Sequence, residues 1–228
     1  MTFLELCQTV RQEVGISGTG PSTVVNQEGQ LKVIVDFVAE ADFQIQSIWH
    51  DWNFLWSQYS STLSVGVRAP AVQKPTDFAN WDTRSFFLNY TSDNSTHLDP
   101  LDYTQWRSEL RQGTAINATP NFVVVQPDDN LIVDPPPDAT YTITADYWRV
   151  PTRMTANTDL SPIPVQYHRI IVSRAKTMWG EREEAPEILV ASSAEYADLL
   201  DKLESQSLPG QGSRRFSSAD TQTIVRTE

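Results

Sequence analysis

The chain has 228 residues, of which 39% are hydrophobic and 20% are charged, so it can form one large domain or one domain with a substantial insertion. Its 17 basic residues are outnumbered by 29 acidic ones, and the net charge of −12 disfavours sequence-independent binding of nucleic acid, which needs clustered Lys and Arg. No apolar run approaches the roughly 20 residues that cross a bilayer, and the single cysteine, Cys7, excludes an internal disulfide framework.

The first predicted element is a helix over residues 2–14, where apolar residues recur at helical spacing. Thr2, with Glu5 three positions later, is typical of a capping box. The glycine-rich residues 15–20 follow this helix rather than a strand, and no Lys-Ser or Lys-Thr pair comes after them. They therefore lack the context of a phosphate-binding loop.

Residues 30–58 carry the strongest periodic signal and predict one long central helix. Apolar residues recur at alternating steps of three and four from Leu31 to Leu55, and no Gly or Pro interrupts them. A second set of apolar residues lies off that stripe: Val33, Phe37, Phe43, Trp49 and Trp56. A helix that is apolar on two faces must be covered on both. Either it is a central core helix, or its second face contacts another subunit through Phe37, Trp49 and Trp56.

From residue 60 to residue 162 the apolar period changes to two, which predicts a β-rich insertion. Residues 128–130, Asp-Asp-Asn, separate two β-branched runs and are typical of a hairpin turn. Residues 140–150 predict one long strand. One short helix is expected inside the insertion, with Asp99 as its cap and Pro100 in its first turn.

Helical spacing returns near residue 163, with one helix expected from Pro164 to Gly180 and another that begins at Pro186. The predicted fold class is α+β, mainly a helical bundle of four helices with one long central helix. The expected parts are a bundle domain at residues 1–59 and 163–206, a β-rich insertion with one short helix at 60–162, and an extended C-terminal arm at 207–228.

The arm has few apolar residues and cannot bury enough surface to fold alone. From Pro209 onward three arginines face two acidic residues, a net of +1, so with −12 for the whole chain the remaining body carries −13. Arginine pairs with carboxylates, an aromatic ring adds apolar burial, and residues 221–227 suit a strand added to the edge of a foreign sheet. The residues expected to bind a neighbour are Arg214, Arg215, Phe216, Ile224, Val225 and Arg226.

The residues show no catalytic constellation. His50, His97 and His168 have no second His or Cys at ligand spacing, so no metal site is expected, and no cofactor either. Solvated loops explain the adjacent carboxylates without a glycosidase cleft. We expect a protein that is not an enzyme.

Six short motifs, in a consistent order, resemble the head-to-tail adaptor (connector) proteins of tailed bacteriophages, and of short-tailed ones in particular. They are residues 1–6, 15–21, 50–55, 146–151, 164–168 and 185–187. The resemblance covers roughly residues 1–209. It implies a helical bundle with an inserted β region and a C-terminal arm that reaches the portal or an adjacent subunit.

The resemblance implies a structural role in the virion, at the head–tail interface, after assembly in the host cytoplasm. Such adaptors form a ring, typically of twelve copies, beneath the portal. The ring extends the DNA channel and docks the tail. The implied partners are other copies of the chain, the portal protein, a tail or nozzle protein, and genomic DNA that passes without sequence-specific binding; no membrane is involved.

An acidic body suits a DNA conduit, because carboxylates repel phosphates and keep the genome from sticking. The candidate channel-facing residues are Asp128, Asp129, Glu181, Glu183 and Glu184. Two other functions stay open. One is a tail nozzle or tail-completion protein. The other is a carbohydrate-binding module, which would need exposed Trp81, Trp106 and Trp148.

Overall fold

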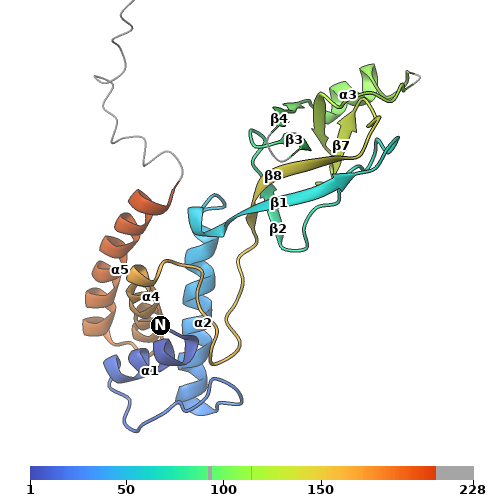
Figure 1. Ribbon diagram of the computed structural model, residues 1–228. Helices are drawn as coiled ribbons and strands as arrows, with labels where there is room; N and C mark the ends of the chain where they lie inside the picture. Colours follow the sequence, from blue (N-terminus) through green and yellow to red (C-terminus); the bar gives the residue numbers. More distant parts are fainter. Residues whose placement is uncertain (92–93, 114, 209–228) are drawn as a thin grey trace, which may run out of the picture. The chain divides into compact units, whose positions relative to one another are not determined.

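The computed structural model describes residues 1–91, 94–113 and 115–208 (Figure 1). The chain divides into two compact units. Among the described residues, the helical unit comprises Met1–Phe54 and residues 151–208, and the β-rich unit comprises Leu55–Val150. The residues of the predicted arm that follow Leu208 lie outside the described residues.

The helical unit contains four α helices: α1 (Phe3–Glu13), α2 (Gly29–Ile48), α4 (Arg169–Arg182) and α5 (Pro186–Ser207). The predicted capping box is present at the start of α1, where the Thr2 hydroxyl accepts from the Glu5 backbone and the Glu5 carboxylate accepts from the Thr2 backbone. A short 3-10 turn, η2 (Val165–Tyr167), precedes α4. Pro186 occupies the first turn of α5, where its missing N–H costs nothing.

The central helix of this unit is α4, and the prediction of one long central helix over residues 30–58 is wrong. Helix α4 packs against α1, α2 and α5 (Figure 1). Helix α2 ends at Ile48 because Trp52 folds back and is fully buried, and its indole N–H donates to the Ile45 carbonyl at 3.2 Å. That bond satisfies a carbonyl of the last helical turn. The apolar spacing continues past Ile48 because a turn, not a helix, buries Trp52.

The β-rich unit contains two sheets, with every ladder antiparallel except the one between β5 and β6. The first sheet has the order β1-β8-β3-β4, and β2 also pairs with β8. Its strands are β1 (Trp56–Leu63), β2 (Phe78–Trp81), β3 (Phe87–Thr91), β4 (Asn94–His97) and β8 (Tyr141–Arg149). The second sheet, in the order β5-β6-β7, has the strands β5 (Asp99–Pro100), β6 (Phe122–Val125) and β7 (Leu131–Asp134).

This unit has its own hydrophobic core, so the chain is α+β as predicted but not mainly a four-helix bundle. The described residues form five α helices and two sheets. Alternate residues of the central strand β8 point into the core, which is why Ile143, Ala145 and Tyr147 are buried. The core side chains come from all parts of the unit: Leu63, Val72, Trp81, Phe86, Leu88, Leu98, Val123, Leu131, Val133, Ile143, Ala145 and Tyr147.

Two local predictions in this unit had different outcomes. The hairpin turn between β6 and β7 is confirmed, with Asp129 in the left-handed region at φ 68°. The short helix is present as α3 (Tyr103–Glu109), but its cap is Asp102, whose carboxylate accepts from the backbone N–H groups of Thr104 and Gln105. Asp99 instead lies in β5 and pairs with Phe122, in keeping with the extended backbone that a following proline favours.

The chain returns to the helical unit through residues 151–163, which buried polar contacts hold against α2. The Gln46 side chain donates to the Thr152 carbonyl and accepts from the Thr152 N–H, both at 3.1 Å. One turn earlier, the Asp42 carboxylate accepts from Gln46 at 2.7 Å and from the Ser161 hydroxyl at 2.5 Å. Asp42 and Gln46 are fully buried. We call Asp42, Gln46, Thr152 and Ser161 the α2 clamp.

Burial raises the pKa of Asp42 to about 6 from its ordinary value of 3.8, although hydrogen bonds from Ser161 and Gln46 oppose the rise. The folded state therefore binds an extra proton between about pH 4 and 6. The contribution of Asp42 to stability is most favourable below pH 4 and is lost as the pH rises through 6. The elevation corresponds to about 3 kcal/mol.

Asp42→Asn should remove this pH-dependent term. Relative to the wild type, the free energy of unfolding of the variant should rise by up to about 3 kcal/mol between pH 4 and pH 7. Denaturant titrations at several pH values measure it. A constant offset between the two proteins would reflect only altered hydrogen bonding with Gln46 and would contradict the proposed titration of Asp42.

Candidate functional site

His168 and Cys7, whose side chains are of types that often act in catalysis, are both buried in the helical unit. His168 is buried, accepting at Nδ1 from the Met1 amino group at 2.9 Å and donating from Nε2 to the Ile163 carbonyl at 2.9 Å. Burial raises the pKa of the Cys7 thiol to about 12, which makes it a poor nucleophile. Within residues 1–91, 94–113 and 115–208, no cluster of three or more His, Cys, Asp or Glu could hold a metal ion.

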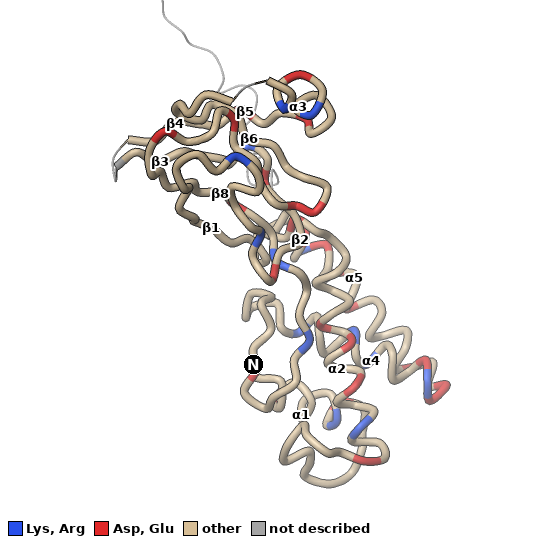
Figure 2. Tube along the Cα trace, turned by 90° about the vertical axis from the view of Figure 1, so that its right-hand side faces the viewer, with Lys and Arg blue, Asp and Glu red and all other residues tan. Residues whose placement is uncertain are grey.

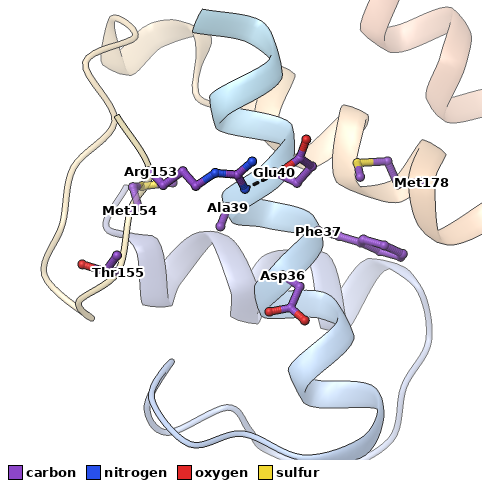
Figure 3. Close-up of a pocket in the computed structure, with 8 residues that line it drawn as sticks. All are labelled: Asp36, Phe37, Ala39, Glu40, Arg153, Met154, Thr155 and Met178. Atoms are coloured by element: carbon purple, nitrogen blue, oxygen red, sulfur yellow. Dashed lines mark ion pairs between the residues drawn. The ribbon is translucent and has the colours of Figure 1, made fainter. Parts of the chain in front are cut away.

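The predicted interface residue Phe37 lines an open hollow of about 470 Å³ on the exposed side of α2 (Figure 3). Figure 3 shows Arg153 reaching from the return segment across α2 to Glu40, while Phe37 and Met178 lie on the other side. The hollow is lined by Asp36, Phe37, Ala39, Glu40, Arg153, Met154, Thr155 and Met178. We call it the α2 hollow.

The α2 hollow combines an adaptable apolar lining with a charged bridge. Met178 is partly exposed, and its flexible, polarisable side chain can adjust to the shape of a contacting group, whereas Met154 is buried beneath the lining. The Arg153–Glu40 ion pair measures 2.5 Å, and the Arg153 guanidinium also lies 4.3 Å from the centre of the Phe43 ring. Because both charged groups are partly exposed, the pair adds at most about 1 kcal/mol to stability. Such a surface suits contact with an apolar side chain of another protein.

Trp49 marks a second exposed position of the helical unit. It follows α2, is 42% exposed, and its indole N–H donates to Glu204 of α5 at 2.9 Å. Ile48 beside it is 40% exposed. Eleven helical positions, or about 17 Å, separate Phe37 from Ile48, the last residue of α2 before Trp49. The two predicted contacts of this unit are therefore separate.

Helix α5 is the least covered of the four α helices in the helical unit. It has 22 residues but buries only Ser192, Leu203 and Ser207. It packs tightly on α4 at Gly180, where an added Cβ would lie 3.0 Å from the Leu189 backbone nitrogen. Val190 is 71% exposed.

The remaining predicted residues lie at exposed turns or strand positions. Trp56 is 46% exposed on β1, opposite Trp148 of β8. Asp128 and Asp129 form the β6–β7 turn, and Asp129 pairs with Lys74 at 2.8 Å. The exposed residues Glu181, Glu183 and Glu184 occupy the corner between α4 and α5, where Figure 2 shows acidic residues on either side of a basic one. The arm residues Arg214, Arg215, Phe216, Ile224, Val225 and Arg226 lie outside the described residues.

Exposed apolar surfaces such as these are typical of a protein that binds other proteins, and the comparison with known families agrees with this interpretation. The family model for the SU10 adaptor protein matches residues 1–223. The chain belongs to the SU10 adaptor protein family. A search of the curated proteins returns no match.

Membership confirms the resemblance to phage head–tail adaptors. As a member of the SU10 adaptor family, the chain is a structural protein of the phage particle and not an enzyme. Portal and tail proteins are the general class of partner for such an adaptor. No helix among the described residues has the length and apolar character to span a bilayer.

The tryptophans that a carbohydrate-binding module would need are mostly inside this adaptor. Trp81 and Trp106 are 4% and 3% exposed. Their indole N–H groups donate to the Asp129 carbonyl at 2.8 Å and to the Asp134 carboxylate at 2.6 Å. Neither ring offers a face on which a sugar could stack, which argues against that function.

Sequence reasoning missed most of the α2 hollow. Arg153, Met154 and Thr155 lie in the return segment, which has no regular secondary structure and hence no period to read. Met178 lies on α4, where the sequence pattern gives it the same position as core residues, but it remains partly exposed. The one available signal was the second apolar set on α2, which includes Phe37.

Phe37→Ala should weaken self-association or partner binding of the adaptor by about tenfold or more, because it removes the aromatic ring of the α2 hollow. The free energy of unfolding should fall by no more than about 2 kcal/mol, since the ring is only partly buried. Sedimentation and denaturant titration measure the two quantities. Val165→Ala, at a residue that is 70% exposed elsewhere on the unit, is the matched control. Equal association of both variants would exclude the hollow as a contact.

Proposed function

We propose that the chain forms a ring, of about twelve copies, at the head–tail junction of the phage particle. In this role it docks beneath the portal, extends the DNA channel and receives the tail or nozzle protein, after assembly in the host cytoplasm. The observation that carries the proposal is the match to the SU10 adaptor family over residues 1–223. The ring, its copy number and its contacts are inferences from that membership and from the surfaces described above.

Exposed apolar positions support the ring. The α2 hollow, the Trp49 end of α2 and the open side of α5 are different surfaces of one unit. Head-to-tail contact between two different surfaces of the same subunit generates a ring when the rotation closes. Phe37, Trp49 and Trp56 are our proposed subunit contacts. Each is exposed or half-exposed, as an interface residue of a free subunit should be.

The excess of acidic over basic residues supports a DNA channel. The −13 body would repel DNA phosphates, whereas a basic lining would retain the genome. The α4–α5 corner presents Glu181, Glu183 and Glu184 with only Arg182 between them, which pairs with Glu183 at 3.5 Å. Asp128 and Asp129 are the candidates in the β-rich unit.

The proposed arm is tested by deleting residues 209–228. Full-length chain mixed with the portal protein from the same genome should give, by native mass spectrometry, a discrete complex that carries a ring of copies. The deletion variant should keep the stability of both described units but lose this complex, because the arm holds the ring to its neighbours. Docking by the deletion variant would refute the role of the arm. Failure of the intact, folded chain to associate would favour a tail nozzle or tail-completion protein.

Neutralising the corner by Glu181→Gln, Glu183→Gln and Glu184→Gln should slow DNA passage if these side chains face the channel, because phosphate repulsion is lost. Ejection kinetics of particles carrying the variant measure it, with Asp128→Asn and Asp129→Asn as the test of the second group. Asp198→Asn with Asp201→Asn, on the exposed side of α5, controls for the loss of acidic charge elsewhere on the unit, and it also removes the exposed Asp198–Lys202 ion pair. Unchanged ejection in all variants would rule out an electrostatic lining by these residues.

A further inference from the structure

Strand β1 leaves one long edge open. It pairs with β8 over all eight residues, from Trp56↔Trp148 to Leu63↔Tyr141, with no register shift. Its other edge has no strand partner among the described residues. An eight-residue edge extends about 26 Å and presents a row of unpaired backbone N–H and C=O groups.

The other edges of the two sheets are short, irregular or covered. Strands β2 and β4 have four residues each, and each has a register shift against its neighbour. Strand β5 has two residues, one of them Pro100. The outer side of β7 is covered, since Ala71 donates to the Leu131 carbonyl at 2.8 Å and Leu131 donates to the Val72 carbonyl at 2.9 Å.

Strand β1 lacks every device that normally protects an edge. Its sequence, WSQYSSTL, contains no charge and no proline, and its ladder contains no bulge. Natural proteins usually blunt edge strands with lysine, proline or bulges, because an unprotected edge recruits other strands. Among the described residues, β1 is therefore the long, unprotected sheet edge to which a further strand could be added.

Residues 221–227 have a composition that suits a strand paired with the open edge of β1. They read TQTIVRT, so Thr221, Thr223, Val225 and Thr227 share one face of an extended segment. The outer face of β1 carries Gln58, Ser60 and Thr62, and the paired positions of β8 include Thr144 and Thr142. Thr and Ser side chains on neighbouring strands hydrogen-bond to each other favourably. The arm also carries +1 against a body of −13, so charge favours its binding to the acidic body of a subunit.

We propose that β1 of one copy accepts residues 221–227 of a neighbouring copy as an added strand. Backbone hydrogen bonds would supply the affinity, and the Thr-rich face would set the register. Each subunit would both donate an arm and accept one, so the contact is head-to-tail and propagates around a ring. The inference rests on the proposed ring and names the surface that receives the arm.

Crosslinking between two variants, each with one added cysteine, tests the contact. Full-length Ser60→Cys and Thr223→Cys proteins are mixed, assembled with the portal protein and treated with a bismaleimide that spans about 8 Å, the diagonal reach between neighbouring strands. Cys7 is fully buried and should not react. Ser95→Cys, on the exposed edge strand β4 of the same sheet, replaces Ser60→Cys in the control.

A heterodimer of Ser60→Cys with Thr223→Cys, in at least tenfold excess over the Ser95→Cys control, is the expected result. No such product in an assembled ring would overturn the inference. A Ser60→Cys/Thr223→Cys double variant that crosslinks only within one chain would overturn it too, because the arm would then cover its own β1.

Placing charge on the edge gives an independent readout. Ser60→Lys with Thr62→Lys leaves the core face of β1 unchanged and should weaken the association constant by about tenfold or more, which corresponds to a loss of about 1.4 kcal/mol of association free energy. Asn94→Lys with Thr96→Lys on β4 is the matched control. If the intact chain forms no ring with the portal protein, the proposed function fails. If rings form equally with and without the β1 lysines, only the β1 acceptor fails.

Discussion

The α2 clamp fixes where the chain comes back into the helical unit, and much of that unit depends on this placement. Gln46 holds both backbone groups of Thr152, and Asp42 holds Ser161, so the residues between them are tied at both ends. Arg153 and Met154 lie in this tied stretch, which sets one wall of the α2 hollow. A buried polar network of this kind costs stability unless every member is hydrogen-bonded, but when satisfied it specifies one arrangement.

The same return segment also positions the start of the chain. The Phe3 N–H donates to the Asp159 carbonyl at 2.9 Å, and the Val24 N–H donates to the Asn157 side chain at 2.7 Å. At the other end of α1, Arg169 and Lys176 of α4 bind Glu13, and Arg169 also binds Glu195 of α5. Burial alone would raise the pKa of Glu13, but the hydrogen bonds from Arg169 and Lys176 outweigh it and lower that pKa. Three helices thus meet at one ion-pair network whose partial exposure makes it an aligning device more than a large source of stability.

Sequence reasoning succeeded where the determining atoms are close along the chain. The capping box at Thr2, the first-turn proline at Pro186 and the turn at Asp129 are each set within a few residues. It failed where distant contacts decide. Trp52 ends α2 because it is buried, and Asp99 joins β5 because Phe122 offers a partner. The share of the fold that the β-rich unit makes up was underestimated for the same reason, because its core brings together residues as far apart in the chain as Leu63 and Tyr147. The family was recognisable from short motifs, whereas the α2 hollow depends on a return segment without any period.

The interleaving of the two units has a consequence during synthesis. Leu55–Val150 is one continuous stretch, so it can fold as soon as it leaves the ribosome. Helices α1 and α2, by contrast, precede their packing partner α4 by more than a hundred residues. At about 5–20 residues per second, their apolar faces, including Leu6 and Ile34, lack the cover of α4 for several seconds. A nascent adaptor therefore exposes apolar surface on α1 and α2 after its β-rich unit can already have folded. Chaperone binding to residues 1–54 would protect the chain most during this interval.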